Sequence, residues 1–281
     1  MNRHLLVNRH ARLSLLLLLF VPLLLQAGDK TENAGAVWTE LGVSKSLPYN
    51  LSVDAELEYR TLDWFKESNR YNVGIGLGYK LNKYLKFGVG YTFIQKHYLE
   101  EVEDHYSDKG NYNGYNVTAP FWIPRHRMAF DVMASKRLWK TLRIGVRERY
   151  QYTHQASKEI SRIKYRKAFD AETGEDIYVP KSDDWEDNFK IKKAKNVHLL
   201  RSRLKLSIDR KGWKWEPYIS VEAHNNLGEQ WHLDKVRTAA GVEYSVAKGH
   251  KLGLGYIFNH ENDDDGNYNI HAVSIGYKYS F

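Results

Sequence analysis

The sequence predicts an all-β protein: a single antiparallel up-and-down transmembrane β-barrel of ten to twelve strands, preceded by a cleaved signal peptide. First, apolar and polar residues alternate with a period of two over segments of about ten residues, the length of a tilted membrane strand. Second, a mean hydropathy of −0.60 with 20 tyrosines is too polar for a bundle of membrane helices but fits a barrel, in which only alternate residues face lipid. Third, the chain begins with a short apolar leader.

The leader, residues 1–27, has the composition of a secretory signal peptide. Arg3, Arg9 and Arg12 precede 13 mostly apolar residues at 13–25, fewer than the roughly 20 that a spanning helix needs. We expect cleavage after Ala27, and an uncleaved anchor is the alternative. Residues 28–35 then form a short polar tail and residues 36–281 the barrel. Secretion combined with many alternating strands indicates the outer membrane of a Gram-negative bacterium.

The clearest strand covers residues 51–60. One face carries Leu51, Val53, Ala55, Leu57 and Tyr59, and the other carries Ser52, Asp54, Glu56, Glu58 and Arg60. Four consecutive inward charges would be costly in a dry core but are tolerable in a wet or fully paired lumen. The same alternation predicts ten further strands, at 37–47, 71–80, 85–93, 126–137, 142–152, 200–208, 215–224, 236–245, 252–259 and 268–281.

The last strand ends the chain on an aromatic residue. Val273, Ile275, Tyr277, Tyr279 and Phe281 form its apolar face, as expected for an outer-membrane strand with an aromatic at its rim. We expect the barrel-assembly machinery to recognise this strand, and the bilayer and lipopolysaccharide to surround the wall. Aromatic residues near the short turns predict an interfacial belt at one rim: Tyr49, Tyr84, Trp139, Trp213, Trp215 and Tyr244.

Short connections are expected to alternate with long ones. The short turns fall at Pro48, Asn82, Trp139, Gly212 and Lys248, and the long connections at 62–69, 97–121, 155–195, 225–234 and 260–267. Eleven strands conflict with the even number usual in bacterial barrels. We therefore expect either a further strand within a long loop or an incomplete first strand at 37–47. Within the loop at 155–195, the turn-like residues 171–174 predict a projecting hairpin over 160–180.

The inward positions of the predicted strands carry an unusual number of charges. Acids concentrate on the second, eighth and ninth strands and bases on the sixth and seventh, and pairing Arg137 with Arg143 would set Asp131 beside Arg147 or Arg149. We expect a structural network of ion pairs in the lumen, with a narrow charge-selecting pore for a small solute as the functional alternative. The candidate network consists of Asp54, Glu56, Glu58, Arg60, Asp131, Arg143, Arg147, Arg149, Arg201, Arg203, Glu222, Arg237 and Glu243.

Two features depart from simple alternation. Glu148 falls on the apolar face, which we attribute to a bulge or a position at the rim, where a charge costs little. Inward glycines such as Gly74, Gly76 and Gly78 are expected to leave room for long side chains from the opposite wall.

An enzyme is the alternative to a channel or structural barrel. A lipid-modifying hydrolase of the phospholipase or lipid A deacylase type needs Ser and His at the rim, and His126, His154 and Ser157 fall near the end of one predicted hairpin. Any hairpin of this composition supplies such residues, so we assign no catalytic residue.

Other chemistries find little support in the sequence. The chain has no cysteine, which excludes disulfides and thiolate chemistry. The acidic run at 263–267 lacks the last glutamate of a calcium loop, so no metal or cofactor is expected. The net charge of +8 is not concentrated in one tail or helix, which argues against nucleic acid.

Several segments resemble an uncharacterised outer-membrane β-barrel family, a domain of unknown function found in Bacteroidota and relatives. These segments are residues 126–137, 143–152, 216–218, 222–225, 236–241 and 252–256. The resemblance covers most of residues 36–281 and implies architecture and location only, because that family has no established activity.

Overall fold

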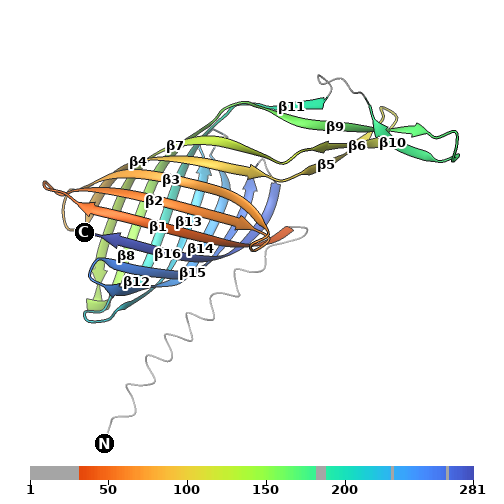
Figure 1. Ribbon diagram of the computed structural model, residues 1–281. Coiled ribbons are helices and arrows are strands. Elements are labelled where there is room, and N and C mark those ends of the chain that lie inside the picture. The colour runs from red at the N-terminus through yellow and green to blue at the C-terminus, as the bar shows by residue number, and fades with distance from the viewer. Residues whose placement is uncertain (1–31, 182–187, 229–230, 264–265) are drawn as a thin grey trace, which may run out of the picture.

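Eleven strands close into a barrel (Figure 1). The computed structural model describes residues 32–181, 188–228, 231–263 and 266–281, so the expected signal peptide lies outside the described residues. The barrel strands are β1 (Glu32–Ser46), β2 (Leu51–Leu62), β3 (Glu67–Lys80), β4 (Leu85–Tyr98), β7 (Phe121–Leu138), β8 (Leu142–Gln155), β12 (Lys195–Ile208), β13 (Trp215–Asn226), β14 (His232–Ala247), β15 (His250–Asp263) and β16 (Gly266–Ser280). No helix among the described residues combines the length and apolar character needed to cross a membrane.

The ring is closed by a parallel pair of strands. β1 lies beside β16 with Trp38 opposite Ser274 and Val43 opposite Tyr279, whereas every other pair in the wall is antiparallel. An odd number of up-and-down strands leaves the first and last running in the same direction, so only a parallel ladder can join them. The long loops do contain further strands, but these lie in a separate sheet outside the ring. The expectation of an incomplete first strand was wrong, because β1 is a full wall strand of 15 residues.

The two rims of the barrel differ. The turns that were predicted to be short all lie at the rim that also holds the C-terminus, where the Ser46 N–H donates to the carbonyl of Phe281 (2.9 Å). Three of the five long connections expected at the opposite rim are in fact short, because β2, β3, β13, β14, β15 and β16 extend farther than their apolar alternation. Near that rim both faces of a strand are polar, which removes the sequence signal. β1 begins at this rim, opposite to the C-terminus.

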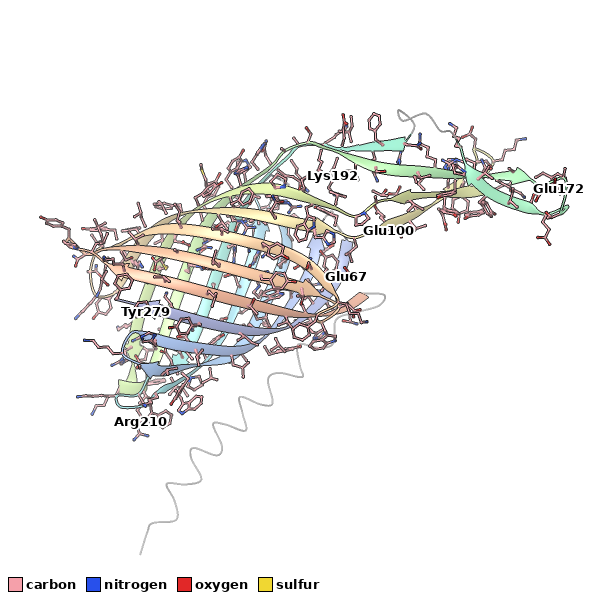
Figure 2. The ribbon with its side chains drawn as sticks, viewed as in Figure 1. Glu67, Glu100, Glu172, Lys192, Arg210 and Tyr279 are labelled. Atoms are coloured by element: carbon pink, nitrogen blue, oxygen red, sulfur yellow. The ribbon has the colours of Figure 1, made fainter. Side chains whose placement is uncertain are left out.

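The two remaining long segments form a projecting sheet rather than irregular loops. We call this sheet the arm (Figures 1 and 2). It consists of β5 (Glu101–Tyr106), β6 (Tyr112–Thr118), β9 (Lys158–Phe169), β10 (Asp176–Pro180) and β11 (Phe189–Lys192). The strands lie in the order β10-β9-β6-β5, and β11 also pairs with β9. Figure 2 shows Glu100 and Lys192 at its base and Glu172 at its tip.

The β9–β10 hairpin predicted within residues 160–180 is confirmed. Gly174 adopts a left-handed φ of 71°, which favours glycine, and its N–H donates to the carbonyl of Asp170 (2.9 Å). The Glu172 N–H donates to the Asp170 carboxylate (2.9 Å), and this hydrogen bond, with others from Thr173, holds the pKa of Asp170 below its usual value.

The barrel wall is apolar outside and polar inside. Leu57, Ile75 and Leu254 are each more than half exposed on the outer face, while a small apolar cluster of Ala36, Trp38, Ile270 and Ala272 lies within β1 and β16. Inward glycines make room for neighbouring rather than opposite strands. A Cβ on Gly241 or Gly255 would approach the hydroxyl of Tyr218, from the strand next to Gly241, to within about 3 Å.

The position of Glu148 contradicts the expectation that it lies in a bulge or at the rim. It lies in the middle of β8, opposite Val132 on β7 and Ser202 on β12, in a continuous register. The Ser202 hydroxyl donates to its carboxylate (2.6 Å). A carboxylate therefore occupies the middle of the apolar outer wall.

Candidate functional site

A long charged cavity fills the barrel. It has a volume of about 1680 Å³ and reaches from Lys251 and Lys278, near the short turns, to Glu101 and Lys192 at the base of the arm. Twelve of the thirteen candidate residues line it. The exception is Arg143, which lies with Arg137 at the short-turn rim, where both guanidinium groups bind Asp209.

The most buried part of the lining is a network around Glu222 on β13. Its carboxylate accepts hydrogen bonds from Arg147 (2.6 Å), Arg201 (2.5 Å) and His224 (2.8 Å), and only 3 % of its side chain is exposed. Asp131 extends the network, because it lies opposite Arg149 as expected and accepts two hydrogen bonds from it (2.6 and 2.8 Å). Alternation places these residues inward on β7, β8, β12 and β13.

A second group joins β2 and β3. Glu58 binds Arg60 through two hydrogen bonds of 2.7 Å and lies 3.5 Å from Arg70. The Arg60 guanidinium stacks on Trp38 at 3.6 Å from the ring centroid, and Arg237 lies 5.0 Å from the same ring. These pairs satisfy charges that lie close together in a confined space.

A more open group lies toward the short turns. Glu243 binds Lys205 (2.8 Å) and Lys251 (3.3 Å), and its side chain is 31 % exposed. Asp54 lies 3.9 Å from Lys86. The ion pairs are therefore tight and buried around Glu222 and looser near this end of the cavity.

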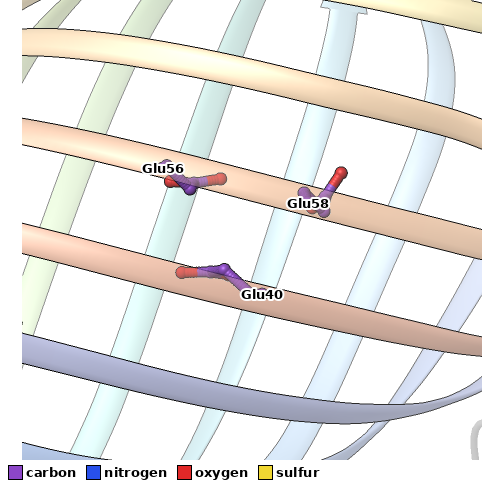
Figure 3. A group of neighbouring side chains, drawn as sticks. All are labelled: Glu40, Glu56 and Glu58. Atoms are coloured by element: carbon purple, nitrogen blue, oxygen red, sulfur yellow. The ribbon is translucent and has the colours of Figure 1, made fainter.

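Three acids face one another on β1 and β2 (Figure 3). Glu40, Glu56 and Glu58 each place one carboxylate oxygen within 4.8 Å of the others. Glu58 is engaged by Arg60, Arg70 and Asn72. Glu40 and Glu56 have no ion pair within 4.0 Å in the described part of the chain, so they form a local acidic sector of the lining.

Several lining residues were missed by the sequence reasoning. Arg70 lies just before the strand predicted at 71–80 and Glu261 within the predicted connection at 260–267, although the two residues belong to β3 and β15. Glu261 binds Lys235 (2.6 Å). His224, the last residue of the strand predicted at 215–224, was given no role although it binds Glu222 (2.8 Å). Extending the period-two register into the polar ends of the strands would have identified Arg70 and Glu261.

The candidate enzyme residues lie on the outer wall. His126 and His154 are direct cross-strand neighbours, but His126 hydrogen-bonds Tyr91 (2.7 Å) and His154 hydrogen-bonds Asn196 (2.8 Å). Among the described residues, no hydrogen bond joins Ser157 to either histidine. The geometry therefore lacks the nucleophile–base contact that acyl transfer requires.

His126 belongs to a repeated arrangement on the outer wall. In each case a histidine forms a hydrogen bond of 2.6–2.8 Å with a tyrosine in the diagonal position on the adjacent strand. The same histidine also contacts a second aromatic ring, directly opposite it on that strand. The pairs are Tyr91–His126, Tyr150–His198, Tyr256–His271 and Tyr277–His250. The aromatics expected at the short turns are also exposed, including Tyr49, Trp139 and Trp215. Such amphipathic rings suit a boundary between apolar and wet surroundings.

Comparison with known proteins identifies a family whose function is unknown. None of the curated proteins matches the chain. Among solved structures, the chain is similar to the β domain of the Bordetella autotransporter BrkA, with 14 % identity and a TM-score of 0.48 over 84 % of this chain and 86 % of that one. A family model described as "Protein of unknown function (DUF2490)" matches residues 35–269. The chain, an eleven-stranded β-barrel, thus belongs to the DUF2490 family.

Proposed function

We propose that this protein is an outer-membrane β-barrel of a Gram-negative bacterium, from Bacteroidota or a related group, whose lumen forms a narrow channel that prefers anions. The apolar outer wall with aromatic residues toward both rims supports the placement in a membrane. Lipid and lipopolysaccharide would surround this wall. The last strand, ending at Phe281, would be the segment that the barrel-assembly machinery binds.

The proposal of an anion-preferring channel rests on the charge of the cavity lining. Among the described residues, nineteen basic and eleven acidic side chains line the cavity. A positive excess inside a confined aqueous space raises the local concentration of anions and repels cations. The acidic sector at Glu40 and Glu56 is too small to reverse this excess.

The buried network limits the size of the solutes that can pass through the lumen. Eleven strands enclose a lumen that side chains fill in large part, and Glu222, Arg201 and Asp131 are each less than a tenth exposed. We expect inorganic anions and small organic anions to be conducted, and larger solutes to be held at the arm-side opening.

The reversal potential across a planar bilayer with a salt gradient tests this proposal. The wild type should show a potential of the sign expected for anion preference. Arg203→Gln should reduce it, because Arg203 lines the cavity, is 37 % exposed and lies 3.9 Å from its nearest carboxylate, Glu222. Lys211→Gln removes the same charge from an exposed turn outside the cavity and should leave the potential unchanged. A cation-selective wild type, or equal effects of the two variants, would contradict the proposal.

A further inference from the structure

The arm is a single sheet with two unlike faces. One face carries Tyr106, Tyr112, Tyr115, Tyr165, Phe169 and Tyr178, whose tyrosine rings contact one another at centroid distances of 4.9–6.0 Å. We call it the aromatic face. The aromatic face also holds the Lys167–Asp176 ion pair (2.5 Å). The opposite face is mostly polar, with contacts such as Lys190–Glu103 (3.1 Å) and Arg166–Asn116 (3.0 Å) beside Ile177 and Val179. A one-sided apolar sheet needs a second layer to cover it.

The aromatic face looks away from the barrel opening. At the base of the arm, Glu101, Thr118 and Ile160 belong to the polar side of the sheet, and all three line the barrel cavity. The aromatic face therefore continues the outer side of the wall. Neighbours in the plane of the membrane would lie on that side.

The edges of the arm do not favour strand addition. β5 carries Glu101, Glu103 and Asp104 at one edge, and β10 ends in Pro180 at the other. Charges and proline blunt edge-to-edge pairing. Most of the exposed apolar groups lie on the aromatic face instead, where Ile163 is 38 % and Phe169 71 % exposed, whereas Ile177 and Val179 of β10 lie on the opposite face.

A second, independent feature lies on the same side of the molecule. The chain of β8 leads directly into β9, and the middle of β8 carries Glu148, hydrogen-bonded to Ser202 on the outer wall. A carboxylate facing lipid at mid-wall is unfavourable. Polar groups in such positions usually have a protein partner.

We propose that a second copy of this chain docks side by side against this surface, with the aromatic faces of two arms packed together and the walls meeting near Glu148 and Ser202. A two-fold axis normal to the membrane keeps both arms on the same side and brings identical faces together. β9, with 12 residues, gives a patch of roughly 40 Å by 15 Å. Two such patches bury about 1,200 Å², the lower limit of stable interfaces, and the wall contact adds to it.

Because the chain has no cysteine, single substitutions can test the interface cleanly. Val117→Cys and Ile163→Cys lie opposite each other on the aromatic face, and Asn116→Cys and Lys164→Cys are their matched controls on the polar face. Each variant of the full chain, in isolated outer membranes, is treated with a short bismaleimide. We expect cross-linked dimers at positions 117 and 163 and monomers at 116 and 164.

The wall contact is tested by the dimer fraction in detergent. Glu148→Leu should lower this fraction at least tenfold at equal protein concentration, whereas Thr39→Leu, a polar-to-apolar change on the outer face of β1 across the ring, should leave it unchanged. Cross-linking at neither aromatic-face position, or equally at all four, would overturn the proposal, as would a protein of monomer mass in both detergent and membranes. Protection of Ile163→Cys from a water-soluble maleimide without dimers would also overturn it, because the face would then lie on lipid.

The inference rests on the outer-membrane placement proposed above but not on conduction. Resistance of the membrane-bound protein to extraction by urea separates the two failures. A protein that is extracted contradicts the placement, whereas one that resists extraction and shows no dimer contradicts only the docking.

Discussion

Replacing Glu222 by glutamine should destabilise the barrel more than any other single neutralisation in its lumen. Glu222 accepts hydrogen bonds from Arg147, Arg201 and His224 at 2.5–2.8 Å. Glutamine keeps the shape and one acceptor but removes the charge. Two guanidinium groups that are each about a tenth exposed would then face each other without the Glu222 carboxylate, and Arg147 would keep only the more distant Asp131, at 4.0 Å.

The size of the effect follows from burial. Removing one partner of a buried ion pair costs about 3–5 kcal/mol, because the remaining charge stays desolvated. The matched control is Glu243→Gln, whose ion pairs are 30 to 44 % exposed on the lysine side. Such exposed pairs contribute about 0–1 kcal/mol. The two substitutions are chemically identical and differ in burial.

Urea unfolding of the two variants in phospholipid vesicles measures the difference. We expect a loss of about 3 kcal/mol or more for Glu222→Gln and under 1 kcal/mol for Glu243→Gln. The double variant Glu222→Gln/Arg147→Gln should recover about 1 kcal/mol, because it removes one stranded cation. Equal losses in the two single variants, or no recovery in the double variant, would refute the idea that burial sets the strength of these pairs.

Three further changes give distinct outcomes. Gly241→Leu should destabilise the barrel by about 1–3 kcal/mol, because a Cβ there meets the Leu254 carbonyl at 2.6 Å, whereas Gly145→Ala, with 3.9 Å of clearance, should be tolerated in the same urea titration. Trp38→Leu removes the ring on which Arg60 stacks and should lower the free energy of unfolding by about 1–2 kcal/mol. Trp139→Leu, on an exposed turn, should lower it by less than half as much, and equal losses would contradict a role for the stacking. Phe281→Ser should reduce the amount of barrel assembled in outer membranes, whereas Tyr49→Ser at the same rim should not; similar yields would argue against a role for the last residue in assembly.

The alternating strands could be predicted from the sequence because, in each of them, apolar and polar residues alternate and so mark the two faces. Residues 51–60 of β2 and 268–281 of β16 show this most clearly, since one face is apolar and the other polar or small. The pairing of Asp131 with Arg149 followed from the short turn at Trp139, which fixes the register of β7 and β8.

The parts that were missed have physical reasons. The polar ends of β3 and β15 carry polar residues on both faces, so no period marks them. Of the arm, only the β9–β10 hairpin was predicted, because β5, β6 and β11 have 4 to 7 residues each and carry too short a pattern to be recognised. The parallel closure between β1 and β16 is a long-range consequence of strand number, and no local pattern encodes it. Glu148 was assigned to a rim or bulge because a charge in mid-wall violates the rule for lipid-facing residues, and the structure shows that it does so in a regular strand.

Single-channel recording of the protein purified from outer membranes tests the central claim most directly, namely that the charged lumen is a continuous aqueous path. Reconstituted in a planar bilayer, the wild type should give discrete current steps of a small conductance, carried mainly by anions. A folded, inserted barrel that carries no current would contradict the claim and would mean that the network around Glu222 closes the lumen.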